Sequence, residues 1–239
     1  MGGDGRFHTT RWTMILSARG TDSEDASAAL AELCRTYWYP AYYFVRRRGN
    51  GPDEAMDLTQ SYFLRMLEKD YLEDVRPEDG KFRSFLLASL KHFLANQHRD
   101  ATTIKRGGEV EWVALDSADA EGRYRQEPPD HRTPEQAYER RWALAVLGRT
   151  KNRLRAEFDD AKKLRQFQLL EPHLSADVTA RSYKEIAVDL DTTESAIKMA
   201  VSRLRRAFGR LLREEIGRTV EDEHVDDEVR HLLSVIREA

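Results

Sequence analysis

The side chains best suited to chemistry in this chain are the basic ones gathered in residues 182–208, SYKEIAVDLDTTESAIKMAVSRLRRAF. Helical spacing keeps their positive charges away from an apolar stripe in the second half of this segment. Such charges can neutralise nucleic-acid phosphates, while polar side chains in the first turn of a helix can reach base edges in the major groove. The residues expected to meet DNA in this way are Glu194, Ser195, Lys198, Ser202, Arg203, Arg205 and Arg206.

Two short helices joined by a tight turn must position these side chains. Ser182 and Glu185 match a capping box that starts the first helix, and Thr193 is placed to cap the second. Asp191 and Thr192 provide the turn. Each helix has one apolar face, formed by Tyr183, Ile186, Ala187 and Leu190 in the first and by Ile197, Val201, Leu204, Phe208 and Leu211 in the second. The pattern predicts a helix-turn-helix, and the alternative is an ordinary helical hairpin with a solvated basic face.

A second group of basic side chains lies in residues 81–99, KFRSFLLASLKHFLANQHR, which contain no acidic residue. Cations with aromatic rings nearby suit a single-stranded nucleic acid, because phosphates meet the cations and bases stack on the rings. The spacing of Phe82, Phe85 and Phe93 alone favours the alternative that these rings belong to the core. The basic and titratable members of this group are Lys81, Arg83, Lys91, His92, His98 and Arg99.

Helices are expected along the rest of the chain, because it shows no alternation typical of strands, and the predicted fold class is all-α. The segment after Ser23 has an apolar face, which Pro40 should kink or break. This face consists of Leu30, Leu33, Tyr37, Ala41 and Phe44. Glycines and prolines without periodicity between residues 102 and 131 predict a linker. Further helices are expected at about 52–70, 82–100, 134–158, 161–170 and 225–236.

The composition excludes several classes of protein. Of the 239 residues, 40% are hydrophobic and 34% are charged, and no apolar run approaches the roughly 18 residues that a membrane span needs. The N-terminal residues lack the basic start and apolar core of a secretory signal, so a cytoplasmic location is expected. The single cysteine, Cys34, excludes an internal disulfide and a cysteine zinc site, and its apolar context indicates an inert core residue.

The net charge of −3 hides an uneven distribution. Residues 181–213 carry eight basic and four acidic side chains, whereas residues 214–239 carry nine acidic and three basic ones. A basic segment followed by an acidic extension indicates an anion-binding face that the bulk charge conceals. One hypothesis is that the acidic extension folds over the basic helix and competes with DNA.

Catalysis has little support in the sequence. Ser195 and Lys198 match the Ser-x-x-Lys pattern of penicillin-interacting enzymes, but the partner motifs are missing and the pair lies in the predicted recognition helix. His92 and His98 are six residues apart, which is a poor helical spacing for a metal, and no phosphate-binding glycine loop occurs. We therefore expect no enzymatic activity, no metal and no cofactor.

Three segments, in this order, resemble the extracytoplasmic-function (ECF) group of the sigma-70 family, the promoter-recognition subunits of bacterial RNA polymerase. Residues 53–67, DEAMDLTQSYFLRML, resemble the part that docks on the clamp helices of the polymerase β′ subunit. Residues 82–100, FRSFLLASLKHFLANQHRD, resemble the part that melts and reads the −10 promoter element. Residues 182–208 resemble the part that reads the −35 element.

The resemblance implies a sigma factor with two helical domains joined by a flexible linker. The domains would be residues 10–102 and 133–213, with the linker at 103–132 and an acidic helical extension at 214–239. The implied partners are bacterial core RNA polymerase, through its β′ clamp helices and its β subunit, and promoter DNA. An anti-sigma factor or another regulator could be a further partner. The free protein should be a monomer without a membrane span.

The resemblance also assigns individual residues. Asp57 and Gln60 fall at polymerase-facing positions, and Lys198 and Arg203 match basic positions of the −35 helix. The residues that fall on the −10 helix are Lys91, His92, Asn96 and Arg99. Departures from the family pattern are Phe85 in place of tryptophan, His92 in place of asparagine, Asn96 in place of aspartate and Asp191 in place of glycine.

Two other functions are compatible with these residues. A stand-alone helix-turn-helix regulator would bind duplex operators without polymerase, and as a dimer it would bind a palindrome with half-sites about one turn apart. A helical interaction protein whose basic faces are incidental would have no affinity for DNA.

Overall fold

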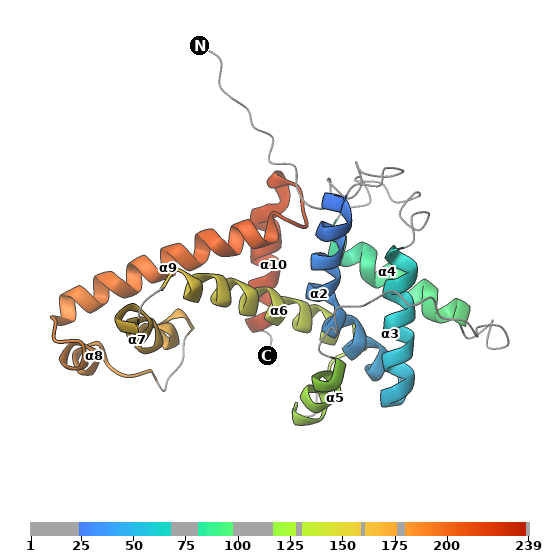
Figure 1. Ribbon diagram of the computed structural model, residues 1–239, viewed down its shortest axis with the longest axis horizontal. Helices are drawn as coiled ribbons and strands as arrows, with labels where there is room; N and C mark the ends of the chain where they lie inside the picture. Colours follow the sequence, from blue (N-terminus) through green and yellow to red (C-terminus); the bar gives the residue numbers. More distant parts are fainter. Residues whose placement is uncertain are drawn as a thin grey trace, which may run out of the picture. The chain divides into compact units, whose positions relative to one another are not determined.

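The computed structural model describes residues 24–67, 81–97, 117–127, 131–158, 161–175 and 180–237 of the chain. These residues form helices and no strand, so the predicted all-α class is confirmed. No helix among them is both long enough and apolar enough to span a membrane. The elements in Figure 1 are α2 Glu24–Arg47, α3 Pro52–Leu67, α4 Phe82–Gln97, α5 Ser117–Gln126, α6 Pro134–Ala156, α7 Ala161–Leu170, η3 Glu171–Leu174, α8 Tyr183–Asp189, α9 Glu194–Ile216, η4 Asp222–His224 and α10 Val225–Arg237.

The chain divides into two compact units. Unit 1 consists of Met1–Ala145 together with Gly217–Ala239, and unit 2 consists of Val146–Ile216. One division point therefore falls inside α6 and the other falls directly after α9. The two domains and the joining linker expected from the sequence have other bounds and stay a prediction.

Aromatic residues of α2 form the centre of unit 1. Tyr37, Ala41 and Phe44 are fully buried, as the helical stripe predicts, and α2 continues through Pro40 without a break. Burial raises the pKa of the Cys34 thiol to about 12, so the group stays protonated, in agreement with an inert core cysteine. α3 packs on α2 and contributes the buried Ala55, Tyr62, Phe63 and Met66.

The short helix α5 lies within the segment that was expected to be a linker. The expectation of irregular structure is therefore wrong for this stretch. Glu121 of α5 accepts hydrogen bonds from Tyr42 at 2.6 Å and from Arg46 at 3.0 Å, both on α2. The Arg46 guanidinium also lies 4.5 Å from the ring centre of Tyr124. A helix this short is marginal alone, so these contacts with α2 stabilise it.

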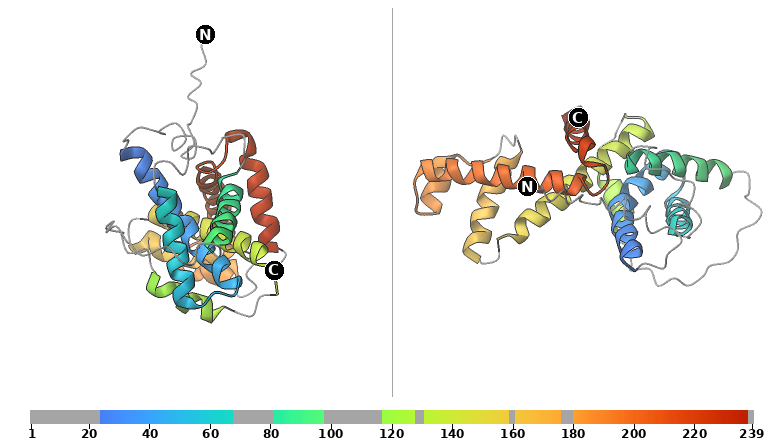
Figure 2. Two further views of the ribbon diagram at one scale, coloured as in Figure 1. Left: turned by 90° about the vertical axis from the view of Figure 1, so that its right-hand side faces the viewer. Right: turned by 90° about the horizontal axis from the view of Figure 1, so that it is seen from above.

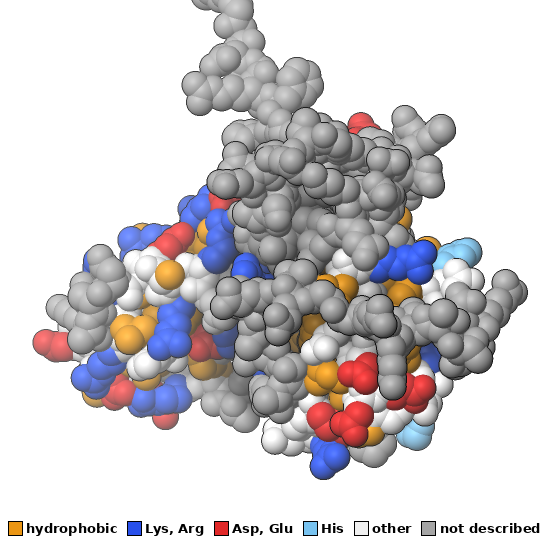
Figure 3. All heavy atoms as spheres, turned by 45° about the vertical axis from the view of Figure 1, so that its right-hand side comes forward, with side chains coloured by type: hydrophobic (Ala, Val, Ile, Leu, Met, Phe, Trp, Pro, Cys, Tyr) orange, Lys and Arg blue, Asp and Glu red, His pale blue; other side chains and the backbone are white. Residues whose placement is uncertain are grey.

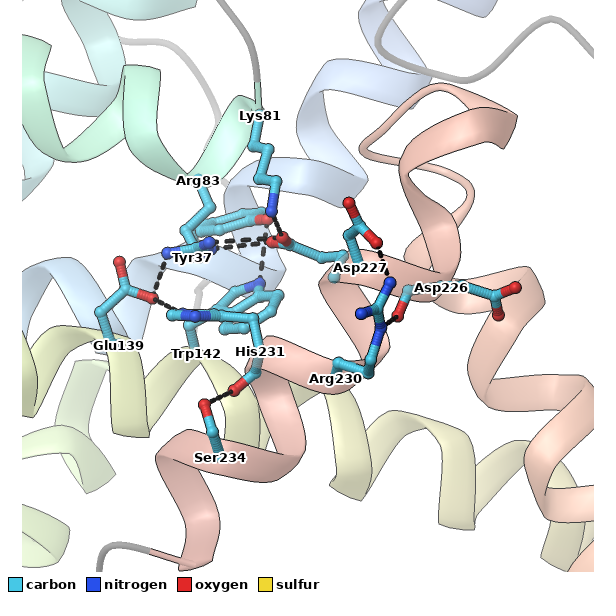
Figure 4. Close-up of polar contacts among 11 residues, drawn as sticks. Tyr37, Lys81, Arg83, Glu139, Trp142, Asp226, Asp227, Arg230, His231 and Ser234 are labelled. Atoms are coloured by element: carbon cyan, nitrogen blue, oxygen red, sulfur yellow. Dashed lines mark hydrogen bonds and ion pairs between the residues drawn. The ribbon is translucent and has the colours of Figure 1, made fainter.

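α10 completes unit 1 by placing an acidic side chain against the start of α4 (Figure 2). Glu228 is 1% exposed; it accepts hydrogen bonds from Arg83 at 2.8 and 3.3 Å and pairs with Lys81 at 2.5 Å. Arg83 also pairs with Glu139 of α6, and His231 of α10 lies 3.1 Å from the same carboxylate (Figure 4). Burial raises the pKa of Glu228, but hydrogen bonds and charge from the two cations outweigh it, and the pKa falls below its usual range.

Unit 2 has its own hydrophobic core, to which α6, α7, α8 and α9 contribute. Its buried members are Leu154, Phe167, Leu170, Ile186, Ala187, Ile197, Ala200, Val201, Leu204 and Leu211. Ion pairs strengthen the contact between α6 and α9, because Arg149 and Arg153 reach the buried Glu215 at 2.7 and 3.1 Å. These contacts hold α9 on the rest of unit 2 while one of its faces stays in solvent.

Candidate nucleic-acid interface

Hydrogen bonds at the start of α8 and of α9 fix where each helix begins. The Ser182 hydroxyl accepts a hydrogen bond from the Glu185 backbone N–H at 3.3 Å, and the Glu185 carboxylate accepts one from the Ser182 backbone N–H at 2.8 Å. The Ser182 hydroxyl also donates to the Glu185 carboxylate at 2.7 Å, and this bond, together with the one from the Ser182 N–H, lowers the pKa of Glu185. The Thr193 hydroxyl accepts a hydrogen bond from the Ala196 backbone N–H at 3.2 Å. Both predicted caps are confirmed.

The turn between α8 and α9 closes as a Schellman motif. The N–H of Thr192 donates to the carbonyl of Ala187 at 2.9 Å, and the N–H of Asp191 donates to the carbonyl of Val188 at 3.3 Å. Asp191 occupies the left-handed position of this motif with a φ of +49°. Glycine adopts this conformation at lower cost, because it has no Cβ. Together with the caps, the turn confirms the two predicted helices and the tight connection between them, which the helix-turn-helix and the helical hairpin share.

α9 has a buried face and an opposite exposed face. Ile197, Val201 and Leu204 are buried as predicted, whereas Phe208 is half-buried. The exposed face includes Met199, a residue that the charge pattern did not single out. The sequence could have identified Met199 as exposed, because helical spacing puts it on the side of α9 opposite the apolar stripe. The other residues of this face in the first four turns include Ser195, Ser202 and Arg206.

All seven residues predicted to contact DNA lie on α9 and are exposed, but some of them already have partners within unit 2. Glu194 and Lys198 form an ion pair of 2.8 Å one turn apart, which lowers the pKa of Glu194 and raises that of Lys198. Arg205 donates Nε and Nη2 hydrogen bonds to the backbone carbonyl of His173, at 3.0 and 2.8 Å. The Arg205 guanidinium thereby ties α9 to η3.

Among these seven residues, the cations least engaged with the protein are Arg203 and Arg206. Within the described part of the chain, Arg203 has no hydrogen bond or ion pair, and Arg206 has only a 3.4 Å hydrogen bond to the Ser202 hydroxyl. Two uncommitted guanidinium groups on one exposed helix can bind phosphate oxygens without first breaking an internal ion pair.

A groove of about 500 Å³ follows the basic side of α9. Tyr183 of α8 borders it, and its lining includes Lys198, Ser202, Arg205, Arg206, Arg210 and Arg213. Figure 3 shows Lys and Arg side chains at its left, in the part of the molecule where Figure 1 places α8 and α9. A groove with several cations attracts an extended polyanion such as a nucleic-acid backbone.

Unit 1 presents the residues that were assigned to polymerase and to the −10 element on two helices. Asp57 and Gln60 are exposed on α3, and His92 and Asn96 are exposed one turn apart on α4. Lys91 pairs with Glu135 of α6 at 2.8 Å, and this hydrogen bond lowers the pKa of Glu135. Arg99 lies outside the described residues.

The core alternative for the phenylalanines of α4 is confirmed for two of them, because Phe82 and Phe93 are buried and Phe85 is half-buried. Arg83 is buried with them and is bound to Glu228, so its charge serves the core of unit 1 and is not presented to a ligand. The hypothesis that the acidic extension covers the basic helix is wrong, because α10 packs into unit 1 through Glu228 and Leu232.

One group of side chains in the described part of the chain could hold a metal ion. Glu221, Glu223 and His224 bring ligand atoms within 4.8 Å of one another, and all three are exposed. Exposed acidic groups of this kind are common without an ion. They belong to unit 1 and form no part of the helix-turn-helix.

The exposed face of α9 carries the kinds of side chain that contact duplex DNA. A capped helix carries serine and acidic side chains in its first turns for base edges and arginines for phosphates. Comparison of the chain with models of protein families, with curated proteins and with solved structures gave no match.

Proposed function

We propose that this chain is an ECF-type sigma factor, which binds bacterial core RNA polymerase and directs transcription initiation from promoters with −10 and −35 elements. The observation that carries the proposal is the capped helix-turn-helix of unit 2, with Arg203 and Arg206 exposed on its second helix. Placed in the major groove, the first turns of α9 would read bases of the −35 element.

The exposed residues of unit 1 support the other two contacts that a sigma factor needs. Asp57 and Gln60 lie on a solvent-facing side of α3, where a polymerase subunit has access to them. His92 and Asn96 offer hydrogen-bonding groups on α4, and such groups can hold an extruded base of the −10 strand. Bound to core polymerase, the chain would hold α4 at the −10 element and α9 at the −35 element of one promoter. Each contact then raises the effective concentration for the other, so two weak interactions give strong binding.

The charge distribution fits a protein that should not coat DNA when free. Non-specific affinity rises with the number of phosphates neutralised. In unit 2, Lys198 and Arg210 are paired with Glu194 and Glu214, so part of the positive charge of α9 is neutralised within the chain. Strong binding would then require polymerase.

The experiment that tests the proposal mixes the purified chain with core RNA polymerase, measures co-elution, and then measures transcription from a library of DNA templates. We expect a stable complex and initiation from a shared promoter motif. Arg203→Glu should weaken promoter use, whereas Arg230→Glu, the same charge change on an exposed residue of α10, should not. Absence of a complex, together with binding to a palindromic duplex by a dimer, would refute the sigma assignment in favour of a stand-alone regulator.

A further inference from the structure

Met199 is the most exposed large apolar side chain of α9, at 61% of its surface. It lies in the second turn of the helix, one turn after Ser195 and one turn before Ser202 and Arg203. An isolated exposed methionine is unremarkable on most surfaces. This one occupies the middle of the face that the proposed function turns towards base edges, where an apolar group needs an apolar partner.

We propose that Met199 reads a thymine, by packing against the C5-methyl group of one thymine in the major groove of the −35 element. The inference rests on the proposed function and names the base that this position recognises. The thymine methyl is the apolar group that an unmodified base pair offers in the major groove. An unbranched thioether side chain is long and adaptable enough to pack against it.

The neighbours of Met199 favour a base over a protein as its partner. Ser195 and Ser202 flank it on the exposed face, and Arg203 and Arg206 follow, so its surroundings on the helix are polar and cationic. A protein-docking surface would continue the apolar area onto adjacent residues. Serines beside an apolar contact can hydrogen-bond the adjoining bases, while the arginines hold the phosphates.

The test removes the methyl group from the DNA and the thioether from the protein. Duplexes are first selected from a randomised library with the full chain, both bound to core polymerase and alone. Each thymine of the selected element is then replaced by deoxyuridine, which lacks only the methyl group, and the dissociation constant is measured. At one thymine the affinity of the wild-type chain should fall by about fourfold. This factor corresponds to the free energy of burying one methyl-sized group.

Variants of the chain assign that loss to one side chain. Met199→Ala should bind the thymine and deoxyuridine duplexes equally, and Met199→Leu should keep the preference for thymine. Val188→Ala is the matched control, because Val188 is an equally apolar and 76% exposed residue of α8; this variant should keep the preference as well.

The outcomes separate the inference from the proposed function. An element with no methyl-sensitive thymine, or a sensitivity that persists in Met199→Ala, overturns the role of Met199 while leaving DNA binding in place. Failure to enrich any duplex, with or without polymerase, overturns the proposed function itself and the inference with it.

Discussion

The replacement Glu228→Gln tests the conclusion that the acidic extension is a structural part of unit 1. The change keeps the shape of a 1% exposed side chain but removes the charge that faces Arg83 and Lys81. Removing one partner of a buried ion pair costs about 3–5 kcal/mol. We expect the lower end, about 3 kcal/mol, because Arg83 keeps Glu139 and the half-exposed Lys81 can turn towards water.

The assay is urea and thermal unfolding of the full chain, followed by circular dichroism and by tryptophan fluorescence. Trp142 reports on this site because the Arg83 guanidinium lies 4.8 Å from its ring centre. A loss of about 3 kcal/mol should lower the midpoint of the affected transition by about 6–12 °C. Asp227→Asn is the matched control, since Asp227 is the exposed neighbour paired with Arg230, and it should change stability by less than about 0.5 kcal/mol.

The pH dependence of unfolding gives a second readout of the same contact. The pKa of Glu228 is lowered in the folded chain, so its contribution to stability is present above the unfolded pKa, about 4.3, and is lost as the pH falls through the folded value. The difference between the wild type and Glu228→Gln should therefore be largest near neutral pH and shrink in acid. Equal stabilities of Glu228→Gln and Asp227→Asn at pH 7 would refute the reasoning.

Two further substitutions test the construction of the helix-turn-helix. Asp191→Gly should raise the unfolding free energy by about 1 kcal/mol, because glycine relieves the left-handed strain at φ +49°. Asp189→Gly places the same residue type at the right-handed end of α8 and removes the ion pair with Arg181, so it should lower the unfolding free energy; urea unfolding measures both. Arg205→Met should lower the unfolding free energy by about 1 kcal/mol through loss of its hydrogen bonds to His173, whereas Arg203→Met should leave it unchanged; equal effects of these two arginine variants would contradict the structural role of Arg205.

Local signals in the sequence were enough to predict the helix-turn-helix. The capping box at Ser182, the cap at Thr193 and the apolar stripe of α9 each depend on residues a few positions apart, and the structure confirms all three. The spacing of the phenylalanines of α4 likewise favoured the core, and Phe82 and Phe93 are buried. The residues that would bind DNA could be ranked only with the structure, because the engagement of Arg205 with His173 spans 32 positions.

Other parts of the fold depend on contacts that no local pattern contains. α5 has a polar sequence with a glycine, and it forms because Tyr42 and Arg46, more than 70 positions away, bind Glu121. The place of the acidic extension is set by the pair Arg83–Glu228, whose members are 145 positions apart. The sequence therefore showed the charge of the extension but suggested the wrong basic partner for it.

The discontinuity of unit 1 has a consequence for biosynthesis. A ribosome that adds about 5–20 residues per second makes Arg83 roughly 7–30 s before Glu228, which follows 145 positions later. Unit 2 is translated entirely within that interval, so its sequence is complete while the core of unit 1 still lacks α10. We therefore expect a released chain that ends at Ile216 to carry a protease-resistant unit 2 beside a unit 1 that is cleaved more readily than in the full chain, because Arg83 lacks Glu228.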